Sequence, residues 1–215
     1  SGLTANPLGG PGDGLGVIAA GGSAVLTEVP EMFGAEQLLM DRCASREVFE
    51  DYRRLILRFQ KYYTDLGFPV YENPSPGNKA GGITTLEEKS LGCVKKGRQR
   101  PHCGGAPYGG RASKPGLAVL EGPGNDLISS TALGAAGCQL VLFTTGRGTP
   151  FSTFVPTLKI ASNSAWQGAG KLDDFDAAPG DGEALYRLVL DTASGAYRCK
   201  SEAQEIAFHK TGVTL

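Results

Sequence analysis

Three features are missing from this sequence, and each absence excludes a class of protein. No apolar run approaches the ~18 to 20 residues that a helix needs to cross a bilayer. The net charge of the 215 residues is only −1, so the basic excess of a nucleic-acid-binding protein is absent. The chain begins at Ser1 without Met, and no charged segment followed by an apolar one resembles a secretion signal. We therefore expect a soluble, cytoplasmic protein with neither membrane nor nucleic-acid partner, cut from a longer chain.

Cysteine is also too sparse and too scattered to organise a metal or redox site. The five cysteines are odd in number and contain no C-x-x-C pair. His102 and Cys103 are adjacent, so their side chains cannot share one face of a strand, and we discount them as a metal pair. Glycine, in contrast, is abundant at 32 residues, roughly twice its usual share of ~7%. We expect reduced thiols and many turns in one domain over residues 1–215.

Apolar periodicity and turn residues predict helices that alternate with strands along most of the chain. The segments 117–120, 125–136 and 139–144 are predicted to form a strand–helix–strand unit with parallel strands. The fold class is therefore α/β, a mostly parallel sheet flanked by helices, with Rossmann-like elements but no nucleotide site. Irregular loops are expected at 98–114 and 166–180. The other predicted elements are strands at 24–29 and 154–161 and helices at 46–66, 85–96 and 182–192, with Ser45 and Thr85 as N-caps.

Three polar clusters follow predicted strands, where the loops of an α/β sheet collect ligands. The clusters are Glu28 with Glu31, Asn125 with Asp126, and the segment Thr144-Thr145-Gly146-Arg147-Gly148-Thr149. We count Asn125 and Asp126 as candidate substrate-binding residues because they open a helix behind a strand.

The segment 144–149 combines hydroxyl groups with a guanidinium directly after a buried strand. Thr144, Thr145, Thr149 and Arg147 together suit the capture of a carboxylate. The alternative interpretation is a glycine turn with a solvated arginine. The residues alone leave both open.

Carboxylates and a loop lysine are the other candidates for chemistry. Glu28 and Glu31 could bind a divalent metal or transfer protons, because hard metals prefer carboxylate oxygens. They could equally be solvated carboxylates at a helix entrance. Lys79 and Asn78 lie in a glycine-rich loop, where the lysine could contact a substrate carboxylate or act as a base; it could also be an ordinary exposed lysine.

Long motifs spread over nearly the whole chain resemble the altronate and galactarate dehydratase family. The form Glu-Val-Pro-Glu-Met-Phe-Gly-Ala-Glu at 28–36 is more similar to the altronate dehydratases than to the galactarate or sulfolactate branches. The sequence departs from the family pattern at 98–112 and 166–179. The resembling stretches are 1–7, 26–36, 73–93, 122–126, 142–150 and 208–215.

This resemblance implies a sugar-acid dehydratase that converts D-altronate to 2-dehydro-3-deoxy-D-gluconate with a divalent metal, Fe(II) or Mn(II). It also implies that the chain is the C-terminal catalytic part of an enzyme about twice as long, with the N-terminal part of that enzyme as its partner. In this interpretation Glu28, Glu31 and Lys79 are catalytic, and Arg147 with the threonines and Asn78 binds the substrate. A non-catalytic binding or oligomer-forming fragment, or a galactarate or sulfolactate lyase relative, is the alternative, and homo-oligomerisation is left open.

Overall fold

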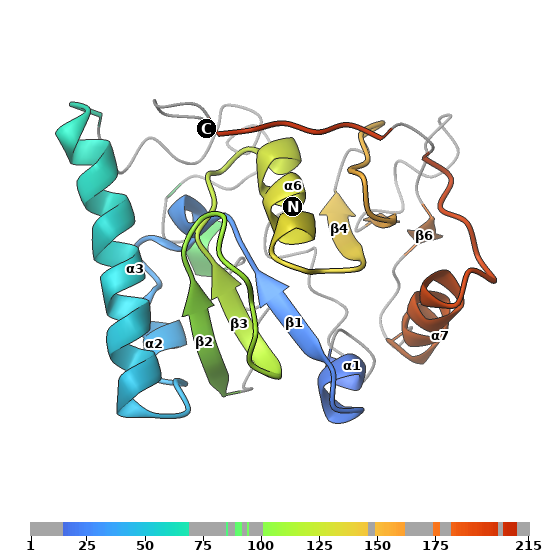
Figure 1. The fold of residues 1–215 in the computed structure, drawn as a ribbon, viewed down its shortest axis with the longest axis horizontal. Coiled ribbons are helices and arrows are strands. Elements are labelled where there is room, and N and C mark those ends of the chain that lie inside the picture. The colour runs from blue at the N-terminus through green and yellow to red at the C-terminus, as the bar shows by residue number, and fades with distance from the viewer. Residues whose placement is uncertain are drawn as a thin grey trace.

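Two parallel three-stranded sheets and their surrounding helices make up the computed structural model (Figure 1). The first sheet has the order β1 (Ser23–Leu26), β3 (Gly116–Leu120), β2 (His102–Ala106). The second has the order β4 (Val141–Thr145), β5 (Thr157–Ala161), β6 (Phe175–Asp176). The described residues are 15–68, 85, 89–91, 94, 101–145, 149–161, 174–176, 182–201 and 204–209. Parallel strands with flanking helices confirm the predicted α/β class.

The longest helix, α3 (Arg46–Asp65), is where the periodicity predicted it. The Ser45 hydroxyl accepts a hydrogen bond from the Val48 amide at 3.2 Å, which satisfies one of the free N–H groups of the first turn. One face of the helix is buried against the first sheet and η2, a 3-10 helix (Val29–Met32). The buried side chains of this face are Val48, Tyr52, Leu55, Ile56, Phe59 and Tyr63.

The other helices are α1 (Leu15–Ala19), α2 (Gln37–Met40), α6 (Asp126–Ala135) and α7 (Gly182–Ala193). The predicted helices at 125–136 and 182–192 are thereby confirmed. Of the predicted helix at 85–96, residues 85, 89–91 and 94 are described; residue 85, the predicted N-cap, is a bend, and the other four are helical. None of the helices formed by the described residues is both long and apolar enough to cross a membrane.

The prediction of an irregular, exposed segment at 98–114 is wrong for residues 102–106, which form β2. This strand could not be predicted from the sequence because Gly104 and Gly105 have low strand propensity. A Cβ atom on Gly105 would lie 3.3 Å from Leu55 Cδ1 of α3, which is a tight contact. The absence of a side chain at Gly105 therefore favours close packing of α3 on the sheet. Within the expected loop 166–180, Phe175–Asp176 form the short strand β6, and most of its other residues lie outside the described part.

The predicted strand–helix–strand unit does not lie in one sheet. β3 is the central strand of the first sheet, with both edges paired, one to β1 and one to β2. No edge remains for β4, which pairs with β5 in the second sheet. The helix α6 therefore connects two sheets instead of two neighbouring strands.

Candidate active site

The carboxyl ends of β1 and β3 lie side by side and bring two of the predicted clusters together. Leu26 is in register with Val119, and just beyond the strands the Val29 amide donates to the Gly122 carbonyl at 3.1 Å. The loops are in close contact, since a Cβ atom on Gly122 would overlap with the Thr27 hydroxyl. The structure thus places Glu28 beside the loop that leads to Asn125.

Glu28 has a backbone conformation that side chains rarely adopt. Its φ of 66° and ψ of 56° are in the left-handed region, and no other non-glycine residue of the described ranges has a positive φ. This conformation costs roughly 1 to 2 kcal/mol for an L-residue. The Glu28 carbonyl accepts the Glu31 amide at 2.9 Å as η2 begins, so the turn is fixed by its own hydrogen bond. A glutamate kept where glycine would be more stable is a candidate for function.

Replacing Glu28 by glycine is therefore expected to leave the free energy of unfolding unchanged or to raise it by up to about 1 kcal/mol. Relief of the left-handed strain should offset the extra backbone entropy of glycine. Urea unfolding of the two proteins measures this difference. A loss of 2 kcal/mol or more would mean that the Glu28 side chain serves the fold.

Glu31 is joined to Lys89 by a nearly buried ion pair. The Lys89 Nζ atom lies 2.7 Å from Glu31 Oε1, and the two side chains are 10% and 16% exposed. A carboxylate neutralised in this way is a poorer ligand for a divalent cation than one facing solvent. Lys89 was not among the sequence candidates.

Lys89→Met is expected to lower the free energy of unfolding by about 2 kcal/mol, because it leaves the Glu31 carboxylate desolvated beside an apolar side chain. Lys89→Arg keeps the charge and serves as the matched control, with a smaller loss. Thermal unfolding of the three proteins measures the effect. Equal melting temperatures for Lys89→Met and the wild type would show that the pair does not stabilise the fold.

Asn125 and Asp126 open α6. The Asn125 Oδ1 atom accepts the Ile128 amide at 3.1 Å, so its side chain is the N-cap of the helix. Asp126 occupies the exposed first turn, where a carboxylate interacts favourably with the helix dipole. The cap already uses the Asn125 side-chain oxygen, which leaves its amide nitrogen for contact with a ligand.

The threonine cluster belongs to the second sheet. Thr144 and Thr145 are the last residues of β4, and Thr149 lies in the following connection. The structure thus separates this cluster from the sheet that carries Glu28, although the arrowheads of β1, β2, β3 and β4 point to the same side in Figure 1. Lys79, Asn78 and Arg147 lie outside the described residues, and their roles stay predictions.

The described donors do not form a complete metal site. In this part of the chain no three His, Cys, Asp or Glu side chains are grouped closely enough to share an ion. Glu31 is in addition engaged by Lys89. Glu28 and Glu31 therefore do not by themselves fit the Fe(II) or Mn(II) that the family resemblance implies.

Glu121 anchors a second group of polar residues at the end of β3, which was not predicted from the sequence. Its carboxylate, 12% exposed, accepts a two-pronged hydrogen bond from the Arg58 guanidinium of α3. It also accepts the Tyr108 amide at 3.1 Å. Arg58 and Glu121 are 63 residues apart, so no local pattern could have paired them. The pair fixes the connection after β2 against α3 and β3.

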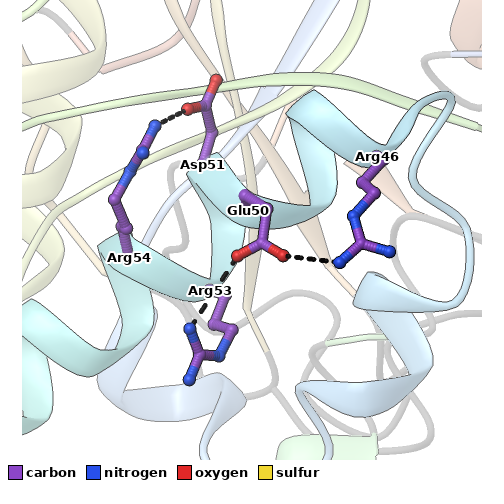
Figure 2. Close-up of polar contacts among 5 residues, drawn as sticks. All are labelled: Arg46, Glu50, Asp51, Arg53 and Arg54. Carbon is purple, nitrogen blue, oxygen red and sulfur yellow. Dashed lines mark hydrogen bonds and ion pairs between the residues drawn. The ribbon is translucent and has the colours of Figure 1, made fainter.

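The outward face of α3 is a different kind of charged surface. Arg46 and Arg53 pair with Glu50, and Arg54 pairs with Asp51, all within one or two turns (Figure 2). Exposed pairs of this type contribute little to stability. Because acidic neighbours compensate the arginines, this face is not a basic binding surface.

His102 and Cys138 have structural environments. The His102 side chain is fully buried, and its Nδ1 atom lies 2.8 Å from the Tyr52 hydroxyl. Burial, with a smaller contribution from Arg42, lowers the pKa of His102 to about 4. Burial also raises the pKa of the Cys138 thiol, which disfavours a thiolate nucleophile.

Comparison with known proteins identifies what the chain is similar to. The family described as D-galactarate/Altronate dehydratase, C-terminal, matches residues 1–214. The altronate dehydratases of Bacillus subtilis and Escherichia coli are 52% and 48% identical to this chain over its whole length. The galactarate dehydratase (L-threo-forming) of Escherichia coli is 32% identical over 94% of the chain and 40% of that protein. The chain spans 46% of each altronate dehydratase, so it matches about half of a longer protein.

Proposed function

Since the chain belongs to the D-galactarate/altronate dehydratase family, we propose that it supplies part of the active site of a sugar-acid dehydratase, a carbon–oxygen lyase acting on D-altronate. The family match over residues 1–214 is the observation that carries this proposal. D-altronate is preferred to galactarate because identity to the two altronate dehydratases, 52% and 48%, exceeds the 32% to the galactarate enzyme.

The proposed reaction removes the proton on C2 and the hydroxyl group on C3. A base takes the C2 proton, the C2–C3 double bond forms, and the C3 hydroxyl leaves as water with a proton from an acid. The resulting enol becomes the 2-keto group of 2-dehydro-3-deoxy-D-gluconate. Because the C2 proton is only weakly acidic, cationic or hydrogen-bonding groups must stabilise the enolate that forms.

In this proposal Glu28 transfers a proton. Its carboxylate follows β1 at the carboxyl edge of the first sheet, and its turn is kept in a strained conformation. Substrate contacts come from the Asn125 amide and from Asp126, which lie at the start of α6, after the adjoining loop. Glu31, held by Lys89, supports the turn that carries Glu28.

The remaining predicted roles extend this proposal. Arg147 with Thr144, Thr145 and Thr149 would bind the substrate carboxylate, with Asn78 as a further contact. Lys79 would act as a base or stabilise the enolate. A divalent metal, Fe(II) or Mn(II), would assist, with ligands beyond the described residues. We further propose a cytoplasmic enzyme whose partners are the sugar acid and the remaining half of the protein.

The test is a substrate panel for the full-length protein that carries this chain. Purified protein with Mn(II) or Fe(II) is incubated with D-altronate, galactarate and (2R)-sulfolactate, and 2-keto product and released sulfite are measured. The proposal expects kcat/KM to be highest for D-altronate. Preference for galactarate or sulfolactate would contradict the substrate, and inactivity on all three would contradict the function.

A second candidate function is a non-catalytic binding or oligomer-forming module. It is favoured by the 46% coverage of the altronate dehydratases and by the incomplete metal-ligand set among the described residues. Calorimetry of the isolated chain with Mn(II) and D-altronate distinguishes the two. Binding with turnover supports a complete site, whereas neither is expected of a module.

A further inference from the structure

The segment 204–209 crosses the molecule at the carboxyl ends of the strands and is fixed there by hydrogen bonds to three different regions. The Glu205 amide donates to the Ser152 carbonyl at 2.8 Å. The Ala207 amide donates to the Thr131 hydroxyl of α6 at 3.2 Å. The His209 amide donates to the Tyr108 hydroxyl at 3.0 Å. Figure 1 shows this segment running along the upper side, past α6.

These bonds place the His209 imidazole against two tyrosines from different elements. Its ring centroid is 5.7 Å from that of Tyr62 on α3 and 5.6 Å from that of Tyr108. The interplanar angles of 61° and 65° are those of edge-to-face packing. The ring thus contacts aromatic side chains from two elements, and within the described residues neither of its nitrogen atoms forms a hydrogen bond.

The inward and outward positions of the side chains in this segment are the reverse of those that burial of apolar groups alone would favour. Side chains alternate along extended backbone, so a shift by one residue would exchange inward and outward positions. The structure exposes Phe208 at 79% and Ile206 at 56%, whereas His209 is partly buried between the tyrosines. A segment that only had to pack would bury the phenylalanine and expose the histidine.

A short chain of contacts connects His209 to the loop beside Glu28. Tyr108 is held through its amide by Glu121, which also binds Arg58. Glu121 is followed directly by Gly122, whose carbonyl accepts the Val29 amide next to Glu28. His209 therefore belongs to the same edge of the first sheet as the proposed proton-transfer residue.

We propose that His209 is a further catalytic residue of the dehydration, as the acid that accompanies loss of the C3 hydroxyl; this inference rests on the proposed function. As the C3–O bond breaks, the proton of the imidazolium passes to the departing oxygen, and water is released. The imidazole is left neutral, the base holds the proton from C2, and exchange with solvent restores both. Histidine is the side chain most often used for such transfers.

The groups that face His209 set the conditions for a pH test. Tyr62 contacts it from α3 and Tyr108 from the connection after β2, while Glu121 and Arg58 lie behind Tyr108. The charges of Arg58 and Glu121 compensate each other, and the pair is present in both the wild type and the variant at position 209. A difference between their pH profiles of kcat is therefore expected to come from His209.

The experiment compares wild-type full-length protein with His209→Gln, His209→Gly and the neighbouring control Phe208→Leu, assayed with D-altronate. His209→Gln is expected to lower kcat by at least about 100-fold with KM changed less than about threefold, and to abolish the fall of kcat at alkaline pH that loss of the imidazolium proton causes in the wild type. Added imidazole is expected to restore part of the kcat of His209→Gly, an effect that a structural role would not produce. Phe208→Leu should behave as the wild type.

Wild-type kcat and pH profile in His209→Gln would overturn the inference, as would a loss in His209→Gly that imidazole does not restore. If the variants do not fold, the wild-type protein is carbethoxylated instead and its remaining activity is measured. Mass spectrometry then locates the modified histidine. Inactivation that D-altronate slows supports the inference, and full activity with His209 modified overturns it. A wild type inactive on every sugar acid contradicts the proposed function instead.

Discussion

Glu28→Gln is expected to reduce kcat for D-altronate by at least about 100-fold, which corresponds to roughly 2.7 kcal/mol of transition-state stabilisation, and to leave the protein as stable as the wild type. The amide keeps the size of the side chain and its capacity to accept a hydrogen bond. It cannot take up or return a proton at neutral pH. The left-handed backbone at this position is unchanged by the substitution.

Kinetics of the full-length protein over a range of D-altronate concentrations measure this effect. The matched control is Glu183→Gln, an exposed glutamate of α7 whose partner is Arg187, with no expected change in kcat. Together with Glu28→Gly, the variant separates catalysis from folding, since both should be stable and inactive. Undiminished kcat in Glu28→Gln would remove Glu28 from the mechanism.

Acid is expected to destabilise the fold through His102 by up to about 3.5 kcal/mol. The pKa of His102 is about 4 in the folded protein, against 6.5 for an unperturbed histidine, because burial disfavours the charged form. The unfolded chain therefore binds a proton at higher pH than the folded chain does. The contribution of the neutral histidine to the free energy of unfolding is fully present above pH 6.5. It is lost as the pH falls from 6.5 to about 4. About 2.5 pKa units at roughly 1.4 kcal/mol each give the magnitude.

Urea unfolding of the chain at several pH values between 7 and 4 checks this prediction, with His102→Gln as the control. Glutamine can still form a hydrogen bond with the Tyr52 hydroxyl but does not titrate, so the variant should lose less stability across this range. Carboxyl groups affect both proteins alike, and the difference between the two curves isolates the histidine. Parallel curves for the two proteins would contradict the buried, neutral state.

Elements with a local signal could be predicted from the sequence. Ser45 and Asn125 cap α3 and α6 through bonds between residues three apart, and the apolar repeat of α3 is visible without any tertiary information. The strands β1, β3, β4 and β5 were found for the same reason, as short apolar runs bounded by turn residues. The parallel α/β class followed from their alternation with helices.

Features that depend on contacts distant in sequence could not be predicted. The division into two sheets follows from the pairing of β3 on both edges, which strand composition does not encode. The Arg58–Glu121 pair and the packing of His209 on Tyr108 join residues 63 and 101 positions apart. Of the candidate residues, Glu28 and Asn125 were predicted because they lie in the connections that follow strands, whereas His209 lies on a segment without a helix or an extended strand.

The most direct test of the central claim is dehydration of D-altronate in D2O, followed by NMR with the full-length protein and Mn(II) or Fe(II). Loss of the C2 proton and of the C3 hydroxyl should give 2-dehydro-3-deoxy-D-gluconate with one deuterium at C3, because the enol is protonated there from solvent. The same signals should be absent with Glu28→Gln. Unchanged D-altronate with the wild-type protein and either metal would contradict the assignment of this chain to a working altronate dehydratase.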